Sequence, residues 1–596
     1  MLGFRDMTRS PSTRRSATML LVAAVLIGQA CGGPSQPSEP TASAQLRASG
    51  SAPAIQSIGH FDPMVYPLAA DAECDQLQSP DVAHGAYTGL IRRIKAIDAR
   101  TVQFEACAPD VAFPARLALA GSGINDTAWL TSHIDPSRSG EQAIVGAVNG
   151  TGPYRLEAWN RGSDISLVRN DAYWGEAARN ERLIVRWRDD PAGRLADLQA
   201  GSVDGIDDVA AADLGAIESD VALQAIPRPG LNVFYMGFNR SFAPFDNVKV
   251  RQAIALGIDR KRIVETLYPP GSEVASYFSP CTIPFGCSGD AWYEFDPPAA
   301  KQLLADAGFP KGFKTTIQYR DVARPYLPDP TAVAMELQAQ LLATLDIQAE
   351  LVVVPEDAFL TTVDEGRADG IHLLGRSASV PEVSALLDPH FGAGATKEFG
   401  QPIEPLVAAL TTGAGSSDRA IRSAAYTNAN NAIRANVPMI PIAHAGAMTA
   451  YRADIAGAQS SPVRQERFAA MAATDRRQFV WLASAEPDGL YCADETGAAA
   501  ELLCSQLTEG LYAFMPGTAS VAPALAEACK PDPELTIWTC TLRAGVTFHD
   551  GAALDANDVV LSFASQWDAE HPLHRGHEGR FQPFIDTFGG QLNPPA

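Results

Sequence analysis

A chain of 596 residues is longer than one hydrophobic core supports, so we expect two or three domains. Hydrophobic residues make up 46% and charged residues 19% of the chain, which is ordinary for a folded, water-soluble protein. The formal net charge of -23 argues against nucleic acid and anionic lipid as partners held by charge.

The N-terminal residues 1–31 have the pattern of an export signal. Four arginines precede the apolar run 19–27, MLLVAAVLI, which is too short to cross a bilayer as a helix. The following Gly-Gln-Ala-Cys resembles a bacterial lipobox, in which Cys31 becomes lipidated; the alternative is an ordinary cleaved signal with a bystander cysteine. Residues 32–57, rich in Ser, Pro, Ala and Gly, are expected to form a disordered tether. We therefore expect an exported protein, anchored by lipid to the outer face of the cytoplasmic membrane.

Eight of the nine cysteines remain when Cys31 is set aside, and an even number in an exported chain favours disulfides. Eight cysteines allow 105 connectivities, so only pairs that are close in sequence can be argued directly, and one pair is left by elimination. No Cys-x-x-Cys occurs, which argues against a zinc ribbon or a redox site. The three local pairs and the remaining pair are Cys281–Cys287, Cys492–Cys504, Cys529–Cys540 and Cys74–Cys107.

Hydrophobic alternation predicts a hairpin early in the chain. Residues 154–159 and 165–168 have strand patterns, and Asn-Arg-Gly-Ser between them is a turn signal. A helix over 192–200 ends at a glycine, and a short strand follows over 203–207. These elements predict one sheet of an α/β domain.

A second group of elements begins with a strand at residues 232–239. Asn247 can cap the helix that follows, whose apolar residues recur at helical spacing. Another helix starts near Asp296-Pro-Pro and ends at a glycine. A strand, a helix and a strand then form a β-α-β unit, and a further strand comes later in the chain; these four elements span 315–319, 332–345, 348–354 and 438–444.

The 28 residues 524–551 read ALAEACKPDPELTIWTCTLRAGVTFHDG. Alternation over 535–542 places Trp538, Cys540 and Leu542 on one face of a strand. Lys-Pro-Asp-Pro before this strand is a turn signal, and His-Asp-Gly ends the stretch with another turn. The pattern predicts a hairpin near the end of the chain.

Several of these segments resemble the family 5 solute-binding proteins of ABC importers. The stretch 524–551 is similar to the family's ALAE followed by T-x-T-x-L-R-x-G-V-x-F-H-D-G, and VRQAIALGIDR at 250–260 is similar to its VRQAI..AIDR. The resemblance implies an α/β, two-lobed, periplasmic-binding-protein-like fold (type II) with an extra subdomain on the first lobe. It also implies that a solute is enclosed between closing lobes and delivered to permease subunits, which an ATPase energises.

The order of the segments differs from the family's. A stretch like 524–551 normally lies near the start of the mature chain, and residues 91–110 resemble what ordinarily follows it. We therefore expect a circularly permuted order, with Ala596 close to the region before Tyr87; the rival explanation is a gene-fusion boundary or a frame error. The expected first lobe is discontinuous and the second continuous, with bounds 58–228 plus 440–596 and 229–439.

The ligand segment departs from the peptide-binding members. Those members bind the peptide's α-ammonium with an Asp in a GW.ADYPDP-like segment, which corresponds here to residues 375–381, GRSASVP. Arg376 stands at the Trp position and Ser379 at the Asp position. A buried ammonium without a carboxylate costs several kcal/mol. Arg376 offers a fork suited to a carboxylate or phosphate, or else it points to solvent or pairs with a carboxylate of its own lobe.

The resemblance also marks other side chains that border the cleft in the family. Tyrosines there could stack on a ligand or hydrogen-bond to it, and each is equally consistent with core or hinge packing. The candidate ligand-binding residues, with the two above, are Tyr235, Asn239, Ser377, His444, Tyr491 and Tyr512.

No Gly-x-Ser-x-Gly, His-Glu-x-x-His or Walker phosphate loop occurs, so we expect neither catalysis nor a cofactor. His571-x-x-His574-x-x-His577 lies in a Pro- and Gly-containing segment, which favours a solvated loop over a metal site. We expect a monomeric receptor for a peptide or similar small solute. The alternatives are a receptor for an anionic solute and a surface lipoprotein that serves as a sensor or scaffold without transport.

Overall fold

Three sheets and their covering helices organise the protein. The computed structural model describes residues 61–68, 73–77, 87–135, 137, 143–474 and 477–594. All of them belong to one unit, His60–Ala596. The predicted export signal, Cys31 and the tether lie outside the described residues. Within these ranges, none of the helices combines the length and the hydropathy needed to cross a membrane.

A seven-stranded sheet contains the predicted hairpin β4–β5, whose strands pair antiparallel. The late strand β18 is inserted between β6 and β7 and runs parallel to both, so a distant part of the chain completes this sheet. In spatial order the strands are β4 (Tyr154–Asn160), β5 (Asp164–Arg169), β6 (Arg182–Trp187), β18 (Gln478–Ala483), β7 (Gly205–Ile206), β15 (Ala447–Arg452) and β8 (Leu223–Arg228).

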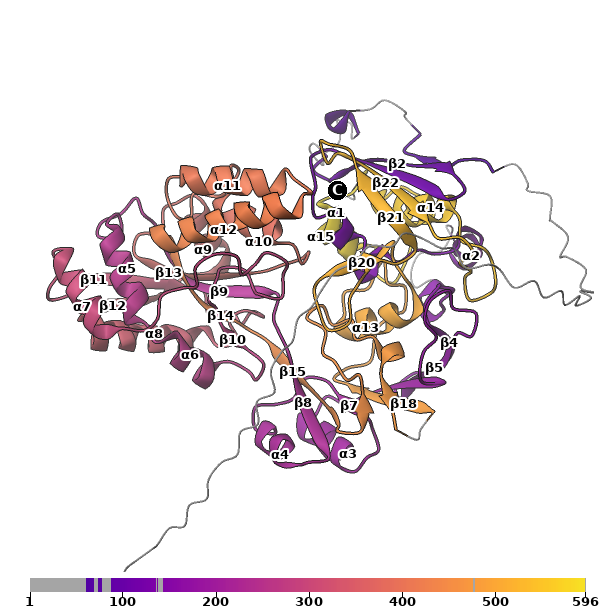
Figure 1. Cartoon of the computed structure of the whole chain (residues 1–596), viewed down its shortest axis with the longest axis horizontal. Coiled ribbons are helices and arrows are strands. Elements are labelled where there is room, and N and C mark those ends of the chain that lie inside the picture. Colours follow the sequence, from indigo (N-terminus) through magenta and orange to yellow (C-terminus); the bar gives the residue numbers. More distant parts are fainter. Residues whose placement is uncertain are drawn as a thin grey trace, which may run out of the picture. The chain divides into compact units, whose positions relative to one another are not determined.

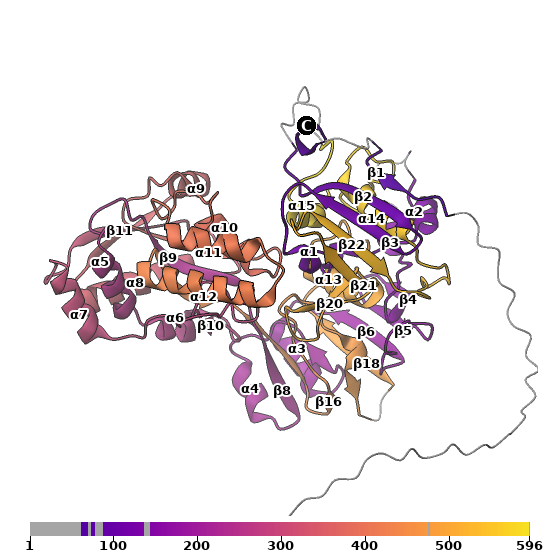
Figure 2. The ribbon, with the colours of Figure 1, turned by 45° about the horizontal axis from the view of Figure 1, so that its top comes forward.

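A five-stranded sheet joins early and late parts of the chain, as Figure 2 shows from the indigo and yellow strands lying side by side. Its central pairing is antiparallel, between β22 and β3. The predicted alternation in β22 is confirmed, because Trp538, Cys540 and Leu542 are all buried. In spatial order the strands are β1 (Val65–Tyr66), β2 (Ile91–Asp98), β3 (Thr101–Ala106), β22 (Ile537–Leu542) and β21 (Ala526–Pro531). The helix α14 (Ala556–Trp567) packs on β2 and β3.

A six-stranded sheet has its own hydrophobic core, whose buried members all lie between Val233 and Ala445. The predicted β-α-β unit is confirmed, because β11 and β12 pair in parallel on either side of α8 (Pro330–Leu345) in the chain. In spatial order the strands are β10 (Glu273–Val274), β14 (Met439–His444), β9 (Asn232–Phe238), β13 (Ile371–Ser377), β11 (Lys314–Tyr319) and β12 (Gln348–Val353).

Helices surround the six-stranded sheet. Asn247 caps α5 as predicted, because its side chain accepts a hydrogen bond from the Lys249 backbone N–H. Figure 1 shows α11 and α12 side by side, and these two helices contact each other closely. The helices are α5 (Val248–Gly257), α6 (Arg260–Leu267), α7 (Pro297–Asp306), α9 (Glu356–Asp364), α10 (Val383–Phe391), α11 (Glu404–Ala414) and α12 (Arg419–Asn436).

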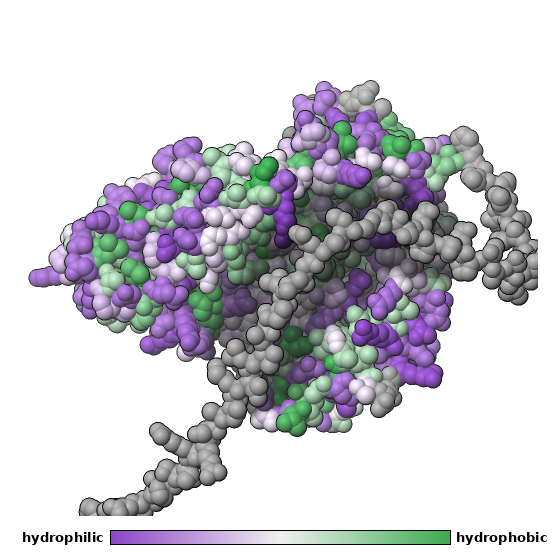
Figure 3. All heavy atoms as spheres, in the orientation of Figure 1, coloured by the Kyte–Doolittle hydropathy of each residue, from purple (hydrophilic) through white to green (hydrophobic). Residues whose placement is uncertain are grey.

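We call the elements around the six-stranded sheet the second lobe and the elements around the other two sheets the first lobe. The chain crosses between them after β8 and after β14. The second crossing falls beyond His444, a few residues later than the expected boundary at 440, because β14 still pairs with β9 over Met439–Ala443. Figure 3 shows hydrophilic and hydrophobic residues interspersed on the surface of the second lobe.

The end of the described chain lies against the start of β2. The Leu90 backbone N–H donates to the carbonyl oxygen of Phe588 at 2.7 Å. The Thr88 hydroxyl donates to the carbonyl oxygen of Gly589 at 3.2 Å. Residues separated by about five hundred positions in sequence are therefore neighbours here, although Ala596 itself lies outside the described residues.

The four predicted disulfides are present: Cys74–Cys107, Cys281–Cys287, Cys492–Cys504 and Cys529–Cys540. The last joins β21 and β22 at directly paired positions. The cysteines sit at different sequence separations, 33 residues for Cys74–Cys107 and 6 residues for Cys281–Cys287. These separations set how strongly each bond restricts the unfolded chain.

Removing the disulfide that closes the longest loop is expected to destabilise the protein more than removing the one that closes the shortest loop. In the loop-entropy account, Cys74→Ala with Cys107→Ala costs about 4 kcal/mol, and Cys281→Ala with Cys287→Ala costs about 2 kcal/mol. Urea unfolding of the two double variants beside the wild type measures this order. A larger loss for the Cys281–Cys287 pair would contradict it.

Candidate ligand site between the lobes

Two neighbouring cavities are lined by residues of both lobes. The hinge cavity, of about 420 Å³, is lined by Leu119 and Arg464 of the first lobe, Asn232 beside the first crossing, and Ser377 of the second lobe. The α10 cavity, of about 700 Å³, lies next to it, and Ser379 lines both. Both volumes are within the range of small-molecule sites.

Charged residues of the first lobe line the hinge cavity or belong to the ion-pair network next to it. Arg228, at the end of β8, donates to Asp207 Oδ1 at 2.5 Å and to Glu466 Oε1 at 2.6 Å. Arg464 lies 3.6 Å from Asp207 Oδ2 and lines the cavity. Glu501 also lines it, and burial raises the pKa of Glu501 to about 7 against the opposing charge of Arg464. The cavity wall therefore presents one paired cation, Arg464, and two carboxyl groups, those of Glu501 and Asp586.

The α10 cavity has a charged wall on each lobe. From the first lobe, Arg116 Nε donates to Asp110 Oδ2 at 2.8 Å, so these two charges satisfy each other. From the second lobe come Arg376, at the end of β13, and Asp388, in the last turns of α10. Burial and the nearby Glu382 carboxylate raise the pKa of Asp388 to about 7.

Three of the predicted ligand residues reach these cavities. Arg376 lines the α10 cavity, Ser377 lines the hinge cavity, and Ser379 lies where the two meet. Arg376 and Ser377 are the last two residues of β13, and Ser379 lies in the loop that follows. Because successive side chains of an extended chain point to opposite sides, Arg376 and Ser377 line different cavities. The altered ligand segment is thus part of the wall between the lobes.

The other predicted residues line neither cavity. The Tyr235 hydroxyl donates to Glu398 Oε1 at 2.8 Å, and Asn239 Nδ2 donates to the Gly366 carbonyl oxygen at 2.7 Å. His444 Nδ1 lies 2.6 Å from the Asn232 carbonyl oxygen, and Tyr491 is buried in the first lobe. Tyr512 is half-buried and accepts a hydrogen bond from the Cys529 backbone N–H. In this structure these five side chains pack or hydrogen-bond within their own lobes, away from both cavities.

Sequence reasoning missed Asp388, Glu501 and Arg464. None of them belongs to a motif, and each reaches a cavity only through the packing of a distant element. A weak signal was available for Asp388, since it is a carboxylate beside the apolar residues Leu386 and Leu387 on α10. A charged side chain at the edge of a buried helix face needs either an oppositely charged or hydrogen-bonding partner, or access to solvent.

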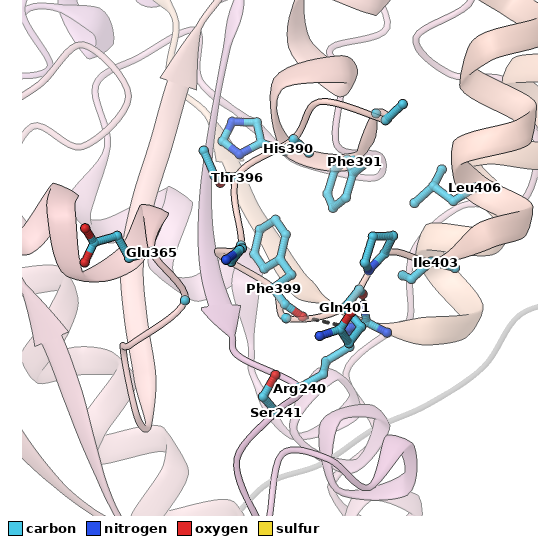
Figure 4. Close-up of a pocket in the computed structure, with 17 residues that line it drawn as sticks. Arg240, Ser241, Glu365, His390, Phe391, Thr396, Phe399, Gln401, Ile403 and Leu406 are labelled. Carbon is cyan, nitrogen blue, oxygen red and sulfur yellow. Dashed lines mark hydrogen bonds between the residues drawn. The ribbon is translucent and has the colours of Figure 1, made fainter.

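A third cavity, of about 270 Å³, lies within the second lobe (Figure 4). Phe391 and Phe399 stack on its wall with ring centroids 5.2 Å apart, and His390 also lines it. Behind this wall Glu398 is buried and accepts hydrogen bonds from His372 Nε2 and His390 Nδ1, each at 2.9 Å. Although burial raises the pKa of a carboxyl group, these two hydrogen bonds lower the pKa of Glu398 to about 2.

Replacing Glu398 with Gln is expected to lower the free energy of unfolding at pH 7 by about 1–3 kcal/mol, because buried donors lose a charged acceptor. The folded pKa lies below the unfolded value of about 4.3, so Glu398 stabilises the wild type above that pH. This stability is lost as the pH falls toward 2. Urea unfolding between pH 2 and pH 7 should show a shallower acid loss for the variant. Identical slopes for both proteins would contradict the assignment.

The histidine segment near the end of the chain differs from the expected solvated loop. His574 is buried, packs on the Phe581 ring with centroids 4.2 Å apart, and places Nδ1 2.8 Å from the Ser565 carbonyl oxygen. His577 Nδ1 lies 3.6 Å from Glu495 Oε1. Among the described residues there is no group of three or more His, Cys, Asp or Glu side chains arranged to hold a metal ion.

The sheets, the two crossings and the shared cavities define a two-lobed α/β binding protein. Residues 70–398 and 520–577 match the family described as bacterial extracellular solute-binding proteins, family 5. The matched residues make up more than half of the chain, so the chain belongs to this family.

Proteins similar to this chain include binding proteins named for heme and for dipeptides. Heme-binding protein A of Haemophilus influenzae is 28% identical over 385 residues, which is 64% of this chain and 70% of that protein. The dipeptide-binding protein of Escherichia coli is 26% identical over 387 residues, 64% of this chain and 71% of that protein. The solved structure of HbpA2 from Haemophilus parasuis aligns with a TM-score of 0.58 and 26% identity, over 66% of this chain and 79% of that one.

Proposed function

We propose that this protein is the extracytoplasmic receptor of an ABC importer. It captures a peptide or similar small solute between its two lobes and delivers it to a membrane permease, without catalysing a reaction. The observation that carries the proposal is the pair of cavities lined by both lobes and sharing Ser379. A solute there contacts both lobes at once, so it stabilises the arrangement in which they approach. Membership of the solute-binding family and the dipeptide-binding relatives support it.

A second candidate is a receptor for an anionic solute. Arg376 lines the α10 cavity, and the position that the sequence aligns with the family's ammonium-binding Asp is occupied by the neutral Ser379. A guanidinium group pairs well with carboxylate and phosphate groups. We further propose that the protein is exported, that it is anchored by lipid at Cys31, and that it is monomeric.

Native mass spectrometry of the purified protein tests the proposal. We expect a co-purified solute of peptide size, released by unfolding and identified by its fragments. Isothermal titration with a panel of di- to pentapeptides, and with small phosphates and dicarboxylates, then separates the two candidates. A protein that is empty as isolated and binds none of the panel would favour the surface scaffold instead.

We also infer that the segment order is circularly permuted with respect to the family. The contacts of Phe588 with Leu90 and of Gly589 with Thr88 support this order, because they bring the two joined regions together. A rearranged chain that begins at residue 477, joins residue 594 to residue 61 through a linker and ends at residue 474 keeps β1 and the Cys74–Cys107 disulfide and tests the inference. We expect it to fold and to keep the solute affinity of the natural order. A chain that is insoluble or unfolded would contradict the inference.

A further inference from the structure

The cavity of about 270 Å³ in Figure 4 is built by the second lobe alone. Its lining residues all lie between Arg240 and Leu406, and most of them belong to the segment that joins α10 to α11. It shares Gly392 and Ala393 with the neighbouring α10 cavity. A molecule held here contacts one lobe, whereas the proposed solute contacts both, so the two cavities serve separate ligands.

One part of this cavity is apolar and aromatic. Phe391 and Phe399 stack in its wall with an angle of 12° between their ring planes. Ile403 and Leu406, at the start of α11, lie beside them in Figure 4. Since an engineered apolar cavity of about 150 Å³ binds benzene, this one holds, in proportion, about eleven non-hydrogen atoms. The volume and the wall therefore fit one aromatic ring that carries a short side chain.

Arg240 brings a positive charge to the same cavity. Its Nε donates to the carbonyl oxygen of Phe399 at 2.9 Å, and its Nη2 donates to the carbonyl oxygen of Gln401. Both acceptors are neutral, and among the described residues no carboxylate forms an ion pair with Arg240. Burial lowers the pKa of Arg240, with no carboxylate to oppose the effect. The guanidinium group is thus held in place by backbone oxygens, while Nη1 has no acceptor within the described protein.

The other charged groups around the cavity leave the charge of Arg240 uncompensated. Glu365 lines the cavity but pairs with Arg367 Nη2 at 2.5 Å. Glu398 lies behind the wall, buried, and its oxygens accept the hydrogen bonds of the histidine cluster. Lys397 adds a second, exposed cation that forms no ion pair with any described residue. In a chain whose net charge is -23, two uncompensated cations at one cavity favour an anionic ligand group.

We infer that this cavity is a second ligand site, which takes a small aromatic carboxylate. The ring of the ligand packs against Phe391 and Phe399, and its carboxylate accepts a charge-assisted hydrogen bond from Nη1 of Arg240. Lys397 adds attraction at longer range. The inference goes beyond the proposed function and does not depend on it, because every residue that it uses belongs to one lobe.

Isothermal titration with 3-phenylpropionate and with 3-phenylpropanamide tests the site, because the two compounds have the same shape and only the first is charged. The wild type is expected to bind the acid about 10-fold more tightly than the amide. Arg240→Gln should weaken the acid by about the same factor and leave the amide unchanged. Ile403→Trp fills the cavity and should weaken both compounds. Arg262→Gln removes an exposed arginine of α6, outside the cavity, and is the matched control that should change neither.

A wild type that does not bind 3-phenylpropionate would overturn the inference, and so would equal affinities for the acid and the amide. Arg376→Gln alters the α10 cavity and should leave the acid's affinity unchanged. A loss in Arg376→Gln, with none in Arg240→Gln or Ile403→Trp, would place the acid in the solute site and overturn the second site. A protein that binds the acid but no member of the peptide panel keeps this site and loses the peptide receptor. Thermal unfolding of each variant shows that it is folded, and Ile403→Trp decides if Arg240→Gln is not.

Discussion

Replacing Arg228 with Met lowers the free energy of unfolding by about 3–5 kcal/mol at pH 7, the range for breaking a buried ion pair from one side. Arg228 is 3% exposed and holds Asp207 and Glu466, which are also buried. Without it, two carboxylates stay in a poorly solvated site with only Arg464 nearby. Because β8 precedes the first crossing between the lobes, we expect the loss to reach the hinge cavity as well.

Urea titration with tryptophan fluorescence measures the change. Arg182→Met is the matched control, because Arg182 pairs with Glu157 on the exposed surface and its loss is expected to cost less than about 1 kcal/mol. Although burial raises it, Arg228 and Arg464 lower the pKa of Asp207 below its ordinary value. Its contribution is therefore present above the unfolded pKa of about 3.9 and is lost as the pH falls through the folded value. Equal destabilisation by both substitutions would refute the role of the network.

Local patterns predicted much of the fold. The alternation that places Trp538 and Cys540 on one face of β22 survives in the sheet, because a half-buried strand has a period of two residues. The Asn247 cap and the parallel pair β11–β12 follow from equally local rules. The pairing of β22 with β3 was not predictable in this way, because the two strands are more than four hundred residues apart.

The same contrast between local sequence patterns and long-range packing applies to the candidate site. Arg376 and Ser379 were found because they stand at aligned positions of a recognisable segment. Tyr235 and Asn239 belong to an equally recognisable segment, but all seven residues of β9 and Asn239 just after it are buried, so their polar atoms are used inside the lobe. Asp388 reaches the cavity through the placement of α10 against the first lobe, which no local pattern encodes. Alignment thus identifies the strand, and packing decides which of its side chains a solute can touch.

Replacing Val380 with Asp is expected to separate the lobes. Val380 is fully buried beside Ala112 and Ala115 of the first lobe, in an apolar contact that is distinct from the cores of both lobes. An unpaired carboxylate in this contact costs several kcal/mol, and about 1.4 kcal/mol changes an equilibrium tenfold. The equilibrium should therefore move away from the arrangement seen here, so the variant should populate it much less than the wild type does. Solution X-ray scattering should show a larger radius of gyration than for the wild type.

Two further variants decide whether the contact or general stability is responsible. Val353→Asp adds the same charge at an exposed position of β12 and should leave the scattering curve unchanged. Val380→Ala removes only part of the contact and should shift the curve less than Val380→Asp does. Because the α10 cavity needs walls from both lobes, the Asp variant should also bind the solute more weakly while unfolding at a temperature close to that of the wild type. An unchanged radius of gyration for Val380→Asp would mean that this contact does not hold the lobes together.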